Sequence, residues 1–73
     1  MDPIYDSSDL GNLLRKRRKA LGYSQAQVAQ LCGTGTRFIS DLENGKPTIE
    51  MGKTLSVTVA LGIDLLPQVR GEA

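Results

Sequence analysis

The stretch from Ser24 to Lys46 constrains the fold more than any other part of the chain, because it predicts two short helices joined by a tight turn. Ser24 and Gln27 have the spacing of a capping box, so the first helix begins at about Ser24. The apolar positions of this helix form one stripe: Val28, Leu31 and Cys32. Gly33 ends the helix and supplies the backbone freedom that a sharp turn requires.

The second helix of this stretch begins at about Gly35 and has two different sides. Its inner side carries Phe38, Ile39 and Leu42, and its outer side carries Thr36, Arg37, Ser40 and Asp41. The outer groups are short polar side chains, one acid and one arginine, which suit hydrogen bonding. Two helices crossed at a steep angle, the second with a polar outer edge, form a helix-turn-helix.

A longer helix is predicted before this stretch, from about residue 7 to Leu21, with Ser7, Ser8 and Asp9 as capping residues. Its inner stripe centres on Leu14 and includes Leu10 and Leu21, and it also places Arg18 on the inside. A buried guanidinium must be paired. We therefore expect an ion pair between Arg18 and Glu43, whereas the alternative is two separately solvated charges.

A fourth helix is predicted after the turn at Asn44-Gly45, with Thr48 as its cap and Gly62 after its end. Its apolar stripe consists of Met51, Leu55 and Val59. The segment 65–69 is too short for a helix and predicts a short strand, in which Leu65, Leu66 and Val69 would pair across a two-fold dimer. The chain is thus expected to be one mainly α domain over 1–73, with an N-terminal arm (1–7) and a dimerising strand and tail (63–73).

Composition excludes several classes of function. The 73-residue chain has a net charge of +1, and five of its nine basic residues are consecutive, from Arg15 to Lys19, where we expect mostly solvated side chains. It contains no histidine, no glycine-rich phosphate loop and one cysteine, Cys32, which we expect to be a small core residue. We expect no enzymatic activity, no cofactor, no metal and no membrane span.

The stretch resembles the Cro/Xre family of phage-repressor helix-turn-helix proteins. The matching positions are Gln25, Ala29, Gly33, Ile39, Leu42, Glu43, Asn44 and Gly45. The resemblance implies a compact lambda-repressor-like domain of four to five helices that binds double-stranded DNA in the cytoplasm. An arginine and a glutamate at the places of Arg18 and Glu43 are typical of this family.

In this reading, the first turns of the recognition helix enter the major groove, and the candidates for base contacts are Thr36, Arg37, Ser40 and Asp41. Asp41 either accepts a hydrogen bond from cytosine or orients Arg37, and we favour the second role. The candidates for phosphate contacts are Gln25, Thr34, Asn44 and Lys46.

Two residues depart from the family pattern. Gly35 stands where a serine or threonine usually caps the recognition helix, so the phosphate contact of a hydroxyl is absent. Phe38 is bulkier than the small residue often found there. Its ring either packs inward beside Ile39 or reaches a thymine methyl group.

A narrower resemblance covers nearly the whole chain. The segments IYDSSDLGNLLRKRRKALGYSQ, ISDLENGKPT and LGIDLLPQV are similar to the HipB-type antitoxins. That resemblance implies a homodimeric repressor that binds a palindromic operator, autoregulates its operon and binds a serine/threonine-kinase-like toxin. The alternatives are a stand-alone phage repressor or restriction–modification controller, which tends to end in a fifth helix, and a protein-interaction module that does not bind DNA.

Overall fold

Four α-helices account for the regular structure of residues 2–71 in the computed structural model, and residues 1, 72 and 73 of the expected arm and tail lie outside the described part. The helices are α1 (Ser7–Ala20), α2 (Gln25–Cys32), α3 (Thr36–Glu43) and α4 (Met51–Ala60). Residues 2–71 form no β-strand. The prediction of a mainly α fold is therefore confirmed, with four helices. None of the described helices is long and apolar enough to span a membrane.

The helix starts agree with the sequence at α2 and differ at α1 and α4. The capping box of Ser24 and Gln27 is formed in full. At α1, however, Asp6 is the cap, and its Oδ1 accepts a hydrogen bond of 2.8 Å from the Asp9 amide. At α4 the cap is Glu50, because the helix begins two residues later than predicted and the Glu50 carboxylate accepts hydrogen bonds from the amides of its first turn, which Thr48 is too far back to reach.

All four helices end in the same way. A glycine with positive φ lies one residue beyond the last residue of α2 and two residues beyond the last residues of α1, α3 and α4: Gly22, Gly33, Gly45 and Gly62. At the end of α2, for example, the Thr34 amide donates to the Ala29 carbonyl over 2.9 Å, which closes a Schellman motif around Gly33. This motif reverses the chain within a few residues and sets the tight turn between α2 and α3.

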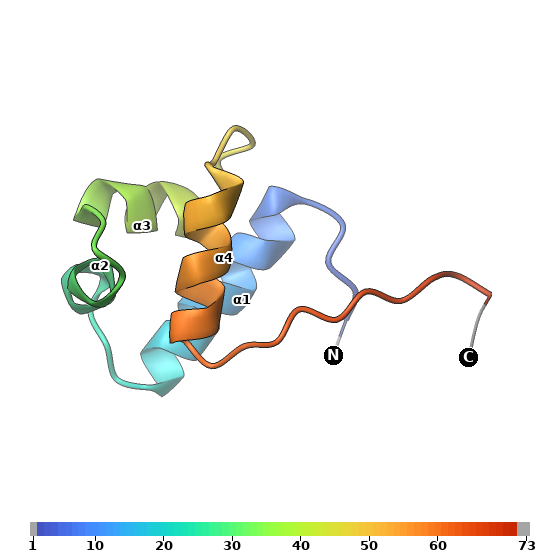
Figure 1. Ribbon diagram of the computed structural model, residues 1–73, viewed down its shortest axis with the longest axis horizontal. Coiled ribbons are helices and arrows are strands. Elements are labelled where there is room, and N and C mark those ends of the chain that lie inside the picture. Colours follow the sequence, from blue (N-terminus) through green and yellow to red (C-terminus); the bar gives the residue numbers. More distant parts are fainter. Residues whose placement is uncertain (1, 72–73) are drawn as a thin grey trace.

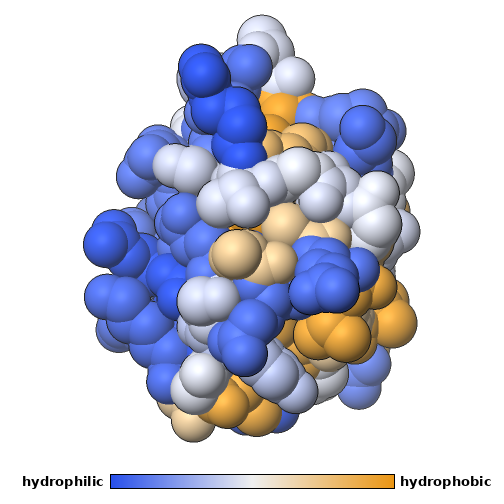
Figure 2. Space-filling view, turned by 90° about the vertical axis from the view of Figure 1, so that its left-hand side faces the viewer, coloured by the Kyte–Doolittle hydropathy of each residue, from blue (hydrophilic) through white to orange (hydrophobic). Residues whose placement is uncertain are grey.

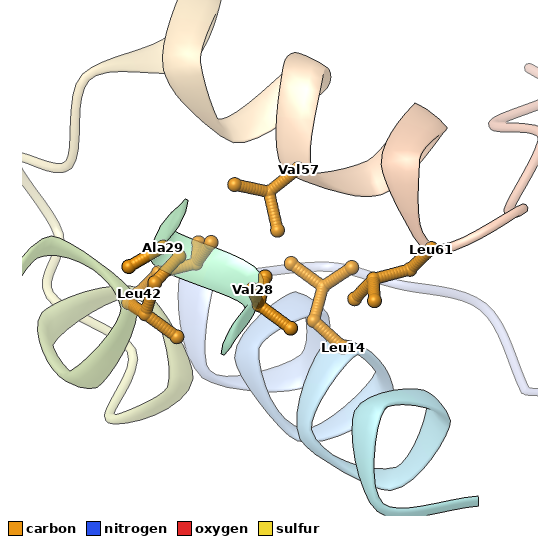
Figure 3. Close-up of a cluster of buried hydrophobic side chains, with 7 residues drawn as sticks. Leu14, Val28, Ala29, Leu42, Val57 and Leu61 are labelled. Carbon is orange, nitrogen blue, oxygen red and sulfur yellow. The ribbon is translucent and has the colours of Figure 1, made fainter. Parts of the chain in front are cut away.

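The helices enclose one small aliphatic core. α2 packs against α3 and α4, and α1 packs against α3 (Figure 1). The buried apolar side chains converge from all four helices and their ends (Figure 3): Leu14, Val28, Ala29, Ile39, Leu42, Val57 and Leu61. Cys32 lies half-buried against this core.

α1 approaches the end of α3 so closely that only glycine fits at the contact. A Cβ atom on Gly11 would collide with the carbonyl oxygens of Leu42 and Glu43. A collision with backbone atoms cannot be relieved by rotating a side chain. The absence of a side chain at Gly11 therefore lets α1 lie directly on the last turn of α3.

Two leucines predicted to lie in the inner stripes are exposed. Leu31 is 61% exposed, and Ala29 takes its place against the core. The small side chain of Ala29 faces the neighbouring helices, so Leu31 lies on the opposite edge of α2. Leu21 is 40% exposed because α1 ends at Ala20 and Leu21 forms the cap beyond it.

The predicted stripe of α4 is also wrong, because Met51, Leu55 and Val59 face outward. The buried side consists of Thr54, Val57, Thr58 and the following Leu61, which also recur at helical spacing. Thr54 and Thr58 can be buried because each hydroxyl donates to the carbonyl four residues earlier, over 2.7 Å and 2.8 Å.

Residues 63–69 run as an extended segment without regular structure (Figure 1). The predicted strand of Leu65, Leu66 and Val69 is not formed in the single chain, and a fifth helix is not formed among the described residues either. A strand requires a neighbouring strand for its hydrogen bonds. These three side chains remain 41%, 85% and 63% exposed.

Candidate nucleic-acid interface

α3 carries the polar face that the sequence identified. Its inner residues Ile39, Leu42 and Glu43 are buried, whereas Thr36 and Arg37 are exposed. Gly35 is its N-cap and makes no side-chain capping bond. Because no side-chain oxygen caps its first turn, the free backbone amides of this turn can bind an anion.

Asp41 organises the charged part of this face. Its Oδ1 lies 3.3 Å from Arg37 Nε, and its Oδ2 lies 3.6 Å from Lys46 Nζ. The Arg37 side chain is 89% exposed and the Asp41 side chain is 26% exposed. Asp41 thus holds two cations at the surface of α3, and one of them, Arg37, extends into solvent.

The sequence predicted a phosphate contact for Lys46 but did not predict its contact with Asp41. The contact follows from the end of α3, where the Lys46 amide donates to the Asp41 carbonyl over 3.0 Å. This bond belongs to the Schellman motif around Gly45, which brings Lys46, the third residue after the helix, back to its last turn. Gly45 was therefore the sequence feature from which the contact could have been inferred.

Four other predicted contact residues lie on α3 or beside its ends, and they differ in exposure and in hydrogen bonding. The Asn44 Nδ2 donates to Ser40 Oγ over 3.4 Å, so these two residues are adjacent. Thr36 is exposed in the first turn of α3, and Thr34 is half-buried in the turn before it. The structure thus brings Ser40 and Asn44 together, and separately Arg37, Asp41 and Lys46.

Gln25 lies apart from this surface group. It is half-buried, and its Nε2 donates to Glu43 Oε1 over 3.1 Å. This bond joins the first residue of α2 to the last residue of α3. The Gln25 side chain is therefore part of the support of α3 in the free protein, a contact that sequence reasoning did not anticipate.

Phe38 packs inward rather than standing free on the outer face. It is half-buried against the core cluster, and Lys53 Nζ lies 5.7 Å from the centre of its ring. This distance is within the range of a cation–π contact. Phe38 therefore links α3 to the first turn of α4.

The expected ion pair lies beneath the polar face. Arg18 Nε lies 2.6 Å from Glu43 Oε2, and Arg18 Nη2 donates to Glu43 Oε1 over 3.0 Å. Arg18 Nη1 donates to the Tyr23 carbonyl over 2.8 Å. Both residues are buried, at 8% and 5% exposure, and no buried side-chain nitrogen or oxygen among residues 2–71 lacks a partner.

The pKa shifts agree with this geometry. Burial raises the pKa of Glu43, but the hydrogen bonds from Arg18 and Gln25 and the nearby arginine charges outweigh burial, so the pKa falls below its ordinary value. The hydrogen bond to Glu43 raises the pKa of Arg18. Both groups therefore carry charge at neutral pH. Burial raises the pKa of the Cys32 thiol, which disfavours its reactive thiolate.

The side of the molecule that displays α2 and the beginning of α3 is mostly hydrophilic or neutral, with hydrophobic areas in separate patches (Figure 2). Such a surface suits a polar, charged ligand such as DNA better than an apolar partner. Within residues 2–71, no group of three His, Cys, Asp or Glu side chains could hold a metal ion.

A family model described as helix-turn-helix (HTH_3) matches residues 14–66, which cover most of the chain and both helices of the motif. The chain belongs to the Cro/Xre-type helix-turn-helix family. The family consists of DNA-binding transcriptional regulators. α2 and α3 are therefore the helix-turn-helix of this Cro/Xre-type protein.

Two curated proteins are related in sequence to this Cro/Xre-type protein. It is 48% identical over 65 residues to the uncharacterized HTH-type transcriptional regulator y4mF of Sinorhizobium fredii, with 86% of each chain covered. It is 33% identical over 63 residues to the ImmF control region 10 kDa protein of Bacillus phage phi105, with 85% of this chain and 69% of the relative covered.

Solved structures with the same fold include two HipB complexes. The HipB-O4 20mer complex has a TM-score of 0.87 at 20% identity, covering 96% of this chain and 99% of the other. The HipA-HipB-O2-O3 complex gives the same TM-score, identity and coverage. At this identity, the likeness establishes the fold of the Cro/Xre-type protein.

The geometry of the ion pair predicts that Glu43→Ala destabilises the protein far more than Asp41→Ala. Removing one partner of a buried pair leaves an uncompensated charge and typically costs about 3–5 kcal/mol, whereas an exposed pair contributes about 0–1 kcal/mol. Urea denaturation followed by circular dichroism measures both free energies of unfolding.

Asp41→Ala is the matched control, because it also removes a carboxylate from α3 and breaks two ion pairs. Equal losses of unfolding free energy in the two variants would contradict a structural role for the Arg18–Glu43 pair.

Proposed function

We propose that this chain is a sequence-specific DNA-binding repressor that acts in the cytoplasm as a homodimer on a palindromic operator. The observation that carries the proposal is the outer face of α3, where Arg37 is 89% exposed and lies beside Asp41 on a helix whose inner side is buried. A rigid helix with a polar, partly cationic outer face fits the major groove of B-DNA.

Thr36, Arg37, Ser40 and Asp41 make the base contacts in this proposal. Arg37 donates two hydrogen bonds to O6 and N7 of guanine. The 3.3 Å contact between Arg37 Nε and Asp41 Oδ1 supports the orienting role of Asp41 over direct contact with cytosine. Because Nε is engaged, the two terminal nitrogens of Arg37 are available for the base.

Gln25, Thr34, Asn44 and Lys46 make the phosphate contacts. Thr34 and Asn44 flank the two ends of α3, and Lys46 lies three residues beyond its last residue. Gln25 Nε2 carries two hydrogens and donates one of them to Glu43, so its side chain keeps a donor for a phosphate. Contacts on both sides of the recognition helix would fix its position in the groove without reading sequence.

A homodimer would place two α3 helices in successive major grooves, about one helical turn apart. Leu65, Leu66 and Val69 support dimerisation because they are apolar, exposed and carried on an extended segment. In a dimer this segment would find the neighbouring strand that a single chain lacks. The chain over 1–73 would then act as one DNA-binding domain.

We further propose that the repressor is the antitoxin of a HipA/HipB-like pair, which binds a kinase-like toxin and autoregulates its operon. The likeness to HipB over 96% of the chain supports this, as does the extended segment at 63–69 where stand-alone regulators tend to have a fifth helix. The stand-alone repressor remains the alternative.

The proposal predicts that Arg37→Ala relaxes base preference at one position of each half-site. Losing a bidentate contact removes about 1–3 kcal/mol of discrimination against the wrong base. Selection of bound duplexes from a random-sequence library, followed by affinity measurements on the selected sites, gives the preference at each position.

Lys16→Ala is the control, because it removes one positive charge from the exposed side of α1. It should weaken binding only slightly and leave the preference intact. An unchanged preference in Arg37→Ala would exclude the assigned base contact. Affinity that does not fall with added salt would favour the protein-interaction module over DNA binding.

The antitoxin proposal predicts that the tagged chain, purified from its native host with nuclease treatment and a high-salt wash, retains a kinase-sized protein that mass spectrometry identifies. If the toxin binds a surface distinct from the DNA-binding face, neither the nuclease nor the high-salt wash should release it. Recovery of the homodimer alone would contradict the antitoxin role and favour the stand-alone repressor.

A further inference from the structure

Asp41 makes two contacts, and the proposed function uses only one of them. Its Oδ1 accepts a hydrogen bond from Arg37 Nε over 3.3 Å, which orients the arginine. Its Oδ2 lies 3.6 Å from Lys46 Nζ. A DNA phosphate would compete with this carboxylate for the same ammonium group. The second contact of Asp41 therefore opposes the binding of Lys46 to DNA.

The fold brings both cations to one carboxylate. Arg37 lies one helical turn before Asp41 on α3, and the Lys46 amide donates to the Asp41 carbonyl over 3.0 Å at the end of the helix. The Asp41 side chain is 26% exposed, compared with 89% for Arg37 and 51% for Lys46. Both cations thus extend further into solvent than the carboxylate that they share.

Asp41 is an anion within a surface that would meet a polyanion. The other acid of α3, Glu43, is buried and paired with Arg18, so Asp41 is the acid that the outer face of this helix presents. A carboxylate that faces phosphates without a cation beside it is repelled by them. The effect of Asp41 on DNA binding therefore depends on whether Arg37 and Lys46 stay with it.

Two kinds of DNA complex would treat these cations differently. At a site with the right guanine, the terminal nitrogens of Arg37 would bind O6 and N7 while its Nε keeps the bond to Asp41. On an unrelated sequence, both cations would turn to phosphates, because phosphate contacts supply almost all of the non-specific affinity. Asp41 would keep a cation in the first complex and lose both in the second.

We propose that Asp41 is a specificity-determining residue that lowers the affinity of this chain for non-specific DNA. Arg37 neutralises the carboxylate on the operator, and the carboxylate lies unpaired near phosphates elsewhere. Specificity is a difference between two affinities, so weakening the wrong complex raises it as effectively as strengthening the right one. This inference rests on the proposed DNA-binding function and adds a second source of selectivity to the guanine contact of Arg37.

Two simpler roles for Asp41 predict different behaviour. A carboxylate that only adds negative charge would weaken binding to every sequence by the same factor. A carboxylate that accepts a hydrogen bond from cytosine would set the preference at one base pair of its own. A carboxylate whose effect depends on the positions of Arg37 and Lys46 would instead change the ratio of operator affinity to non-specific affinity.

Asp41→Asn tests the inference, because asparagine keeps the shape and an acceptor oxygen for Arg37 Nε and removes the charge. Fluorescence anisotropy gives the affinities for a selected operator duplex and for a scrambled duplex of the same composition. The variant should bind the scrambled duplex about fivefold more tightly, the effect expected for one repulsive contact between charges in water. Its affinity for the operator should change much less.

The salt dependence of binding to the scrambled duplex gives a second readout. The slope of log affinity against log salt should become steeper by about 0.9 in Asp41→Asn if Lys46 gains one phosphate contact. Lys46→Gln should reverse this gain in the Asp41→Asn chain and should weaken non-specific binding less in the original chain. Equal losses from Lys46→Gln in the two chains would overturn the inference, because Asp41 would then not restrain Lys46.

Asp64→Asn is the matched control. It removes the same charge from an exposed aspartate in the segment that follows α4, so it should leave the ratio of the two affinities unchanged. The carboxylates of Asp41 and Asp64 are both accessible to solvent, so both variants should keep the helical circular dichroism of the original chain.

The remaining outcomes separate this inference from the proposed function. If Asp41→Asn changes both affinities by the same factor while the original chain prefers its operator, the inference fails and the DNA-binding proposal stands. Reselection of duplexes with Asp41→Asn would overturn it by a lost preference at a base pair that Arg37→Ala leaves unchanged, because Asp41 would then read that base. If the original chain prefers no selected duplex over the scrambled one, the proposed function itself fails.

Discussion

The buried pair of Arg18 and Glu43 is the interaction on which the arrangement of α1, α2 and α3 depends. Arg18 reaches Glu43 with two nitrogens and the Tyr23 carbonyl with the third, and Gln25 donates to the same carboxylate. One cluster thus joins α1, the connector, the start of α2 and the end of α3. Such a pair adds little net stability when intact, but removing either member leaves the other as an unpaired buried charge, which strongly destabilises the fold. The cluster specifies one orientation of α3.

α3 separates its two carboxylates by role. Glu43 faces inward and is neutralised by Arg18, whereas Asp41 faces the surface and lies between Arg37 and Lys46. The inner carboxylate holds the helix in place, and the outer one holds an arginine near a defined position. An arginine that is already oriented loses less conformational freedom on binding. The fold therefore supplies both the rigid support and the polar face that a DNA-reading helix requires.

The sequence predicted the features that depend on local signals or on a single unavoidable pairing. The capping box of Ser24 and the glycine turns are local, and Arg18 required an acid within reach. The sequence did not predict which side of α4 is buried, because two stripes of this helix have helical spacing. The buried stripe contains Thr54 and Thr58, whose hydroxyls donate to backbone carbonyls of the same chain. The sequence also missed the contact of Gln25 with Glu43, because residues 18 positions apart meet only through tertiary packing. The predicted strand at 65–69 is not formed among the described residues, because a strand requires a neighbouring strand for its hydrogen bonds.

The measurement that tests the central claim most directly is nuclear magnetic resonance of the labelled chain during titration with a duplex selected from a random library. The account predicts that the largest backbone shift changes fall between Thr34 and Lys46, while the amides of the buried side of α4 change little. The Arg18 and Glu43 signals should show that their pair persists in the complex. Shift changes concentrated on α1 or on the outer face of α4, with α3 unaffected, would contradict the assignment of α3 as the DNA-reading helix.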